Sequence, residues 1–137
     1  MDVEVSPVSC EAGGSREHDV SVTLTSDVPK NVAQLPDYLT GGGKRFPVGN
    51  MRSNLLVYAP TGGEITDVRS SDGTTSVTTR IHDGLQVKAR TLLLKPGESV
   101  TTTYRIDSGA PLRGAIRVRT TPGPTADRFT VSVEQCP

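Results

Sequence analysis

Short segments in which apolar and polar residues alternate are the feature that most constrains how this chain can fold. The clearest example is HDVSVTLTSD at 18–27, where valine and leucine alternate with serine and threonine. An apolar side chain at every second position is typical of a β-strand with one buried and one solvated face. The pattern therefore predicts strands, because the apolar residues of an amphipathic helix recur every three or four positions instead.

Segments of this kind recur about every ten residues and are separated by turn signals. Asp72-Gly73 and Asp83-Gly84 are typical of tight turns, and KPGE at 95–98 combines a proline that presets φ with a glycine that accepts positive φ. The predicted strands are 2–8, 18–27, 52–60, 64–71, 75–82, 85–94, 99–107, 114–122 and 127–135. They predict an all-β fold: an antiparallel two-sheet sandwich, immunoglobulin-like in the broad sense, of about 7–9 strands. A closed barrel is the alternative.

The 137 residues suit a single domain that spans 1–137. One long loop at 28–51 interrupts the alternation, because it holds Pro29, Pro36, Pro47 and three adjacent glycines, with room for one helical turn near 31–38. The alternation also predicts a mostly buried core. Its expected members are Val20, Val22, Leu24, Leu55, Val57, Leu93, Tyr104, Ile116, Val118, Val131 and Val133.

The charges balance overall but not along the chain. Fifteen basic and fifteen acidic residues give a formal net charge of zero, which disfavours nucleic acid as a partner. Acidic residues predominate in residues 1–38 and basic residues in residues 80–119. We expect acidic and basic strands to lie side by side in a sheet and to compensate one another.

Two cysteines lie far apart in the sequence, at Cys10 and Cys136, and this spacing does not match the closely spaced ligands of a zinc site. We expect a disulfide that joins the first strand to the last; two unrelated buried thiols are the alternative. A disulfide would place the domain in an oxidising compartment outside the cytoplasm.

The stretch LPDYLTGGGKRF at 35–46 contains the glycines and the lysine of a phosphate-binding loop. That motif, however, needs a glycine where Tyr38 stands, a serine or threonine where Arg45 stands, and a helix afterwards. We therefore predict no bound nucleotide and no cofactor.

No other pattern indicates catalysis or a metal site, so we predict that the protein is not an enzyme. His18 and His82 are expected to be exposed on strands, since no nucleophile elbow accompanies them. The aspartates are dispersed and do not form a calcium loop. No apolar run is long enough to span a membrane, so membrane contact is expected only through segments outside this sequence.

Five motifs follow one another along the chain: DVSVTLTSDVP, LPDYLTGG, NLLVYAPTGGEITDV, LLLKPGESVTTTYRI and RFTVSVEQC. In this order they resemble the C-terminal region of an actinobacterial family, domain-of-unknown-function family 4012. The resemblance covers residues 18–135 and is most specific at Leu35–Gly42 and Val57–Gly63. The chain departs from the family at SDVP, where members commonly have an NTAP-like stretch. Members are envelope proteins with an N-terminal membrane segment and a large external portion, and the family has no assigned activity.

The resemblance implies an extracellular, cell-surface domain that is anchored in the full-length protein. Together with the sandwich pattern, it predicts a non-enzymatic interaction or structural module of a bacterial cell-envelope protein, acting in surface-polymer or envelope assembly. The alternative is a glycan-binding accessory domain of a carbohydrate-active or transferase system.

A row of arginines is the candidate ligand-binding feature. Arg113, Arg117 and Arg119 have the spacing of one strand face, and Arg105 extends the row from the preceding strand if the register allows. Guanidinium groups bind carboxylates and phosphates in bidentate geometry, so the expected partner is an envelope protein or an anionic cell-wall polymer. The alternative is that carboxylates on a neighbouring strand neutralise the row.

Overall fold

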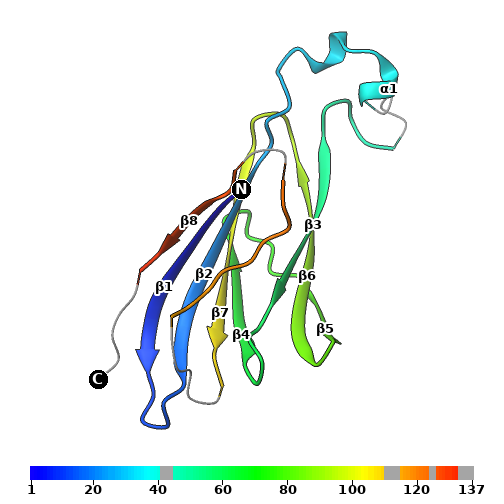
Figure 1. Ribbon diagram of the computed structural model, residues 1–137. Helices are drawn as coiled ribbons and strands as arrows, with labels where there is room; N and C mark the ends of the chain where they lie inside the picture. The colour runs from blue at the N-terminus through cyan, green and yellow to red at the C-terminus, as the bar shows by residue number, and fades with distance from the viewer. Residues whose placement is uncertain (41–44, 110–114, 124–125, 133–137) are drawn as a thin grey trace.

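The described residues form eight β-strands in two sheets that pack as a sandwich. The structure, a computed structural model, describes residues 1–40, 45–109, 115–123 and 126–132. The five-stranded sheet has the order β4-β7-β2-β1-β8 and the three-stranded sheet the order β3-β6-β5; they lie to the left and right in Figure 1. The predicted all-β sandwich is confirmed, in place of the closed barrel.

The elements follow the predicted ranges closely. They are β1 (Asp2–Cys10), β2 (Arg16–Thr25), the 3₁₀ turn η1 (Val32–Gln34), the short helix α1 (Asp37–Thr40), β3 (Met51–Tyr58), β4 (Glu64–Ser70), β5 (Thr78–His82), β6 (Leu85–Leu94), β7 (Ser99–Asp107) and β8 (Arg128–Val131).

Neighbouring strands are antiparallel except at one edge of the five-stranded sheet. There β8 runs parallel to β1, with Asp2 opposite Arg128 and Val5 opposite Val131. The first and last strands are therefore neighbours, as the disulfide prediction requires, although their parallel direction departs from the antiparallel pattern expected throughout.

Two predicted turns form as their residues dictate. Asp83 and Gly84 both have positive φ, 49° and 77°, as a two-residue turn of type I′ between β5 and β6 requires. Between β6 and β7, the amide of Glu98 donates to the carbonyl of Lys95 at 3.0 Å, and Gly97 has a φ of 75°.

The β3–β4 turn, TGG at 61–63, needs glycine because the backbones approach closely. Gly62 has a φ of 79°, and a Cβ at Gly63 would collide with the carbonyl oxygen of Asp107 at the end of β7. A Cβ at Gly109 would likewise collide with the carbonyl of Gly62. The glycines therefore let this turn pack directly on the end of β7, the strand that pairs with β4.

One predicted strand, at 114–122, is wrong over its described residues. Residues 115–122 belong to no strand, yet they keep the expected alternation: Ile116 and Val118 are half-buried, and Arg117 and Arg119 are exposed. Val118 packs against the core, and Figure 1 shows residues 115–123 crossing in front of the five-stranded sheet (orange). Alternation reports which side is buried, whereas a strand also needs a hydrogen-bonded neighbour, which this segment lacks among the described strands.

The core lies between the sheets and matches most of the prediction. Val22, Leu55 and Tyr104 are buried, and Val20, Leu24 and Val57 are half-buried. Two positions were predicted wrongly, Leu93 at 48% exposed and Val131 at 36% exposed. In the run of three leucines, Leu92 and Leu94 take the inner face, so Leu93 must point outward.

Val131 is exposed for a different reason from Leu93. Val131 lies on an edge strand, and Val133 lies outside the described residues. The expectation for His18 was also wrong, because it points inward from β2 and is buried. Burial, more than the nearby positive charge of Arg16, lowers the pKa of His18.

The long connection between β2 and β3 carries η1 and α1 and rises beyond one end of the sandwich at the top of Figure 1. It is anchored at its base. Val32 is buried, Gly49 has a φ of 86°, and a Cβ at Gly49 would collide with the side chain of Val32. Residues 41–44 of this connection lie outside the described residues.

Cys136 lies outside the described residues, so the disulfide stays a prediction. Cys10 ends β1, and it is separated from Cys136 by the same number of positions as Asp2 is from its partner Arg128 in the parallel pair. We propose that the two cysteines are bonded. The chain-entropy model gives on the order of 4–5 kcal/mol for closing a loop of more than about 100 residues.

Alkylation of the denatured protein should then label both cysteines after reduction and neither before it. Reduction should also lower the melting temperature. Labelling of both thiols without reduction, in protein recovered from an oxidising compartment, would show that the disulfide is absent.

Replacing Gly63 by alanine should destabilise the fold by about 1–3 kcal/mol, because the new methyl group meets backbone that cannot move aside. Chemical denaturation measures this change. The matched control is Gly13→Ala, where a Cβ would meet nothing within 4 Å. Equal unfolding free energies for the two variants would contradict the close packing of the β3–β4 turn.

Candidate functional site

The outward face of the five-stranded sheet carries a ladder of hydroxyl side chains. Serine and threonine of β2 lie opposite serine and threonine of β7 in consecutive outward pairs. Their oxygen–oxygen distances are 2.9 Å for Ser21–Thr103, 2.7 Å for Thr23–Thr101 and 2.8 Å for Thr25–Ser99. These cross-strand hydrogen bonds stabilise the pairing and leave a flat, polar surface.

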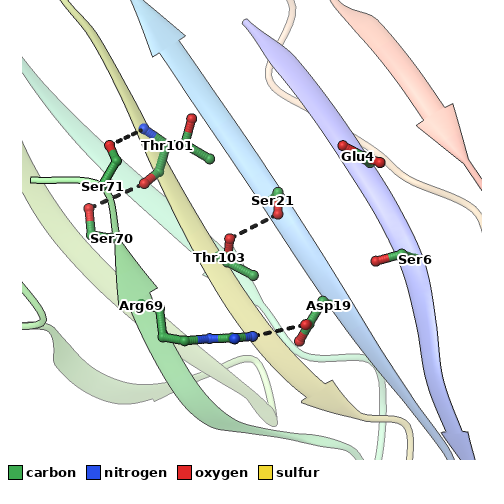
Figure 2. A pocket seen from close by; sticks show the side chains of 9 residues that line it. All are labelled: Glu4, Ser6, Asp19, Ser21, Arg69, Ser70, Ser71, Thr101 and Thr103. Carbon is green, nitrogen blue, oxygen red and sulfur yellow. Dashed lines mark hydrogen bonds and ion pairs between the residues drawn. The ribbon is translucent and has the colours of Figure 1, made fainter.

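A shallow depression of about 530 Å³ lies on this face (Figure 2). Six of its lining side chains carry hydroxyl groups, and the other three are Glu4, Asp19 and Arg69. Asp19 and Arg69 are bonded to one another at 2.8 Å. Glu4 is exposed and has no hydrogen-bond or ion-pair partner among the described residues. The depression thus offers one unpaired carboxylate among hydroxyl groups.

Arg105, a member of the predicted arginine row, is neutralised beside this depression. Its guanidinium donates to both carboxylate oxygens of Asp19, at 3.0 and 3.1 Å, across the β2–β7 pair. The Arg105 hydrogen bond, with Arg69 adding to it, lowers the pKa of Asp19. This pair joins the acidic first part of the chain to the basic later part, as expected from the charge distribution.

Of the other arginines of the row, Arg117 and Arg119 are not on a strand that pairs with the strand of Arg105. Arg117 and Arg119 are exposed on the unpaired segment at 115–123, with no ion pair among the described residues. Arg113 lies outside the described residues. Because residues 115–123 form no strand of the sheet, no strand register connects Arg117 and Arg119 to Arg105 among the described residues.

The outward face of the three-stranded sheet has a different chemistry. Leu56 and Tyr58 of β3 and Leu93 of β6 are 48%, 40% and 48% exposed. Arg52 of β3 and Arg80 of β5 are exposed on the same side, because both lie at outward positions of the ladder. We call this surface the cationic face. Sequence reasoning missed it because Leu93 had been assigned to the core.

Aromatic side chains organise the cationic face. The hydroxyl of Tyr58 and Nδ1 of His82 are hydrogen-bonded at 3.0 Å, which links β3 to β5 across β6. Val87 lies opposite Tyr58 on β6 and is only 5% exposed although it points outward. Farther along, the guanidinium of Arg52 lies 5.9 Å from the ring centre of Phe46, a cation–π geometry.

Between the sheets lies a buried guanidinium that the sequence reasoning overlooked. Arg90 of β6 is 4% exposed and donates to the hydroxyl of Thr102 in β7 at 2.7 Å, to the hydroxyl of Ser70 in β4 and to the carboxylate of Asp72. Its Nε has no partner among the described residues. Burial of Tyr104 raises the pKa of its hydroxyl to about 12.

A signal for Arg90 was present in the sequence. Arg90, Leu92 and Leu94 are alternate residues of one strand, so their side chains must point to the same face of the sheet. Asp72, which the sequence marked only as a turn residue, supplies its counter-charge. The Arg90 hydrogen bond is the main cause that lowers the pKa of Asp72 to about 2.

Neither a metal site nor a membrane helix is found in the described part of the chain. No three histidine, cysteine, aspartate or glutamate side chains gather there in a way that could hold a metal ion. None of its helices is long and apolar enough to cross a membrane. Comparison of the sequence and structure with protein-family models, curated proteins and solved structures finds no match.

The Asp72–Arg90 pair should make stability depend on pH in the acid range. The pKa of Asp72 is about 2 in the fold, below the ordinary aspartate value of 3.8, so the unfolded chain binds the proton first as the pH falls. The stabilisation is present above about pH 4 and is lost towards about pH 2.

Asp72→Asn should therefore lower the melting temperature at neutral pH, because it leaves Arg90 buried without its counter-charge. The difference from wild type should shrink between about pH 4 and about pH 2, as the wild type protonates. Circular dichroism melts at several pH values measure this. Asp27→Asn is the control, since Asp27 is exposed and makes no hydrogen bond or ion pair with another described residue. Equal melting temperatures for wild type and Asp72→Asn at neutral pH would contradict the assignment.

Proposed function

We propose that this chain is a non-enzymatic extracellular domain of a bacterial cell-envelope protein, acting as an interaction module in surface-polymer or envelope assembly. The observation that carries the proposal is the cationic face, which we assign as the docking surface. The resemblance to domain-of-unknown-function family 4012 supports the location, and so does the proposed Cys10–Cys136 disulfide.

The composition of the cationic face favours binding. Tyrosine and arginine are the residue types that dominate the energetic centres of protein interfaces. Tyr58 is held in place by His82, and Arg52 by the ring of Phe46, so their side chains lose little freedom when a partner binds. Exposed Leu56 beside them supplies apolar area that a partner would cover.

The charge of the face indicates the kind of partner. Arg52 and Arg80 have no carboxylate partner among the described residues. Guanidinium groups in this state attract carboxylate- or phosphate-rich surfaces, such as an acidic envelope protein or an anionic cell-wall polymer. The cationic face therefore takes the role that the sequence reasoning gave to the arginine row.

A glycan-binding accessory domain is the second candidate. The observation that favours it is the depression of Figure 2, whose hydroxyl groups and Glu4 could hydrogen-bond to a sugar. Sugar sites usually also present aromatic rings for stacking, and the lining of this depression contains none. Tyr58 belongs to the opposite sheet. The geometry therefore supports the docking role better.

Retention on an immobilised, phosphate-bearing wall polymer tests the proposed function. Arg52→Ala with Arg80→Ala should reduce retention at low salt on the order of tenfold, because two unpaired guanidiniums of the face are lost. Arg117→Ala with Arg119→Ala removes the same charge from the 115–123 segment and should leave retention near that of wild type. Added salt should weaken binding of the wild type.

Two outcomes would count against the cationic face. Equal retention of wild type and the Arg52/Arg80 variant would remove it as the docking surface. A loss confined to the Arg117/Arg119 variant would return the role to the exposed arginines of the 115–123 segment.

A further inference from the structure

The two outward faces of the sandwich differ in charge. In the five-stranded sheet the cross-strand register assigns ten charged side chains to outward positions, seven carboxylates and three guanidiniums, for a net charge of minus four. They are Asp2, Glu4, Glu17, Asp19, Glu64, Asp67 and Asp107, with Arg69, Arg105 and Arg128. We call this surface the acidic face.

The cationic face shows the opposite balance. Its outward ladder positions carry two guanidiniums, Arg52 and Arg80, and no carboxylate. Asp83 lies in the turn that follows His82, with its carboxylate 3.8 Å from Nε2 of that histidine. Because the whole chain has a formal net charge of zero, two copies do not repel one another at long range. The charge is separated between opposite sides of one neutral domain.

We propose that the cationic face of one copy docks on the acidic face of a second copy. This inference rests on the proposed role of the cationic face as the docking surface, and it names the partner as the same chain. Charge complementarity carries it: each copy presents both an anionic surface and the guanidinium groups that such a surface attracts.

The depression of Figure 2 gives the contact a place to begin. Glu4 lies at its rim without an ion-pair partner among the described residues, whereas Asp19 is already occupied by Arg69 and Arg105. An incoming guanidinium from the second copy can therefore pair with Glu4 and donate further hydrogen bonds to the neighbouring hydroxyl oxygens. Arg80 and Arg52 are the donors of that kind on the cationic face.

The geometry determines the kind of assembly. The outward sides of two packed sheets point in opposite directions, so the acidic and cationic faces of one copy cannot both contact the same neighbour. The contact is heterologous, and each added copy leaves one face of each kind free at the ends of the chain of copies. Association should therefore extend beyond dimers as concentration rises.

Sedimentation velocity of the purified domain tests this with two charge-reversal variants. Arg52→Glu with Arg80→Glu removes the cationic face, and Glu4→Lys with Glu64→Lys removes acidic charge at exposed positions without described partners. Wild type at low salt should show an average mass that rises between about 10 µM and about 1 mM, the range of weak contacts. About 0.5 M salt should suppress it.

Mixing the variants gives the sharpest outcome. Each variant alone should remain a monomer, whereas an equimolar mixture should associate, because the intact acidic face of one variant meets the intact cationic face of the other. Arg117→Glu with Arg119→Glu, which reverses two charges off both faces, should associate like wild type. Circular dichroism confirms that every variant is folded.

Three results would overturn self-docking. They are a wild type that stays monomeric at about 1 mM in low salt, variants that associate as wild type does, and a variant mixture that stays monomeric. Monomeric wild type that is still retained on the wall polymer through Arg52 and Arg80 would overturn self-docking and leave the proposed function standing. Self-association without polymer retention would support this inference and count against an anionic polymer as the partner.

Discussion

The buried guanidinium of Arg90 links the two sheets of this domain. Arg90 lies on β6 in the three-stranded sheet. Its guanidinium donates a hydrogen bond to Thr102 in the five-stranded sheet and forms an ion pair with Asp72 just beyond β4. Apolar contacts between the sheets have no preferred direction, so they tolerate small shifts. A buried charge does not tolerate such shifts, because losing its hydrogen-bond and ion-pair partners costs several kcal/mol. We infer that Arg90 selects one register of sheet on sheet among many that the apolar core would accept.

The inward orientation of Arg90 also determines which side chains of β6 lie on the outside of the molecule. With Arg90 and Leu92 pointing inward, Leu93 must point outward, and the cationic face follows from the same parity. In the other sheet, inward Val22 and Tyr104 leave Ser21 and Thr103 outside on the hydroxyl ladder. The domain thus separates an acidic, hydroxyl-rich surface from a cationic, partly apolar one. Both proposed roles use these surfaces, and neither requires chemistry within the core.

Much of the fold could be predicted from local patterns because the relevant forces are local. Alternation located the strands, and Asp83-Gly84 and Pro96-Gly97 marked turns, because glycine accepts positive φ readily and aspartate tolerates it. The candidate site was harder. The arginine row assumed a strand at 114–122 and a favourable register for Arg105, but strand pairing depends on partners distant in sequence. In the structure Arg105 forms an ion pair with Asp19, and residues 115–123 pair with no described strand.

The sequence by itself determined the all-β class, the positions of most strands and turns, and the balance of charge, because periodicity and turn chemistry act over a few residues. The tertiary structure decided which parity of each ambiguous run faced the core, as with Leu92 and Leu93, and which opposite charges met. It also decided that β8 lies parallel to β1. These outcomes depend on contacts between residues far apart in the chain, whose free energy no local pattern records.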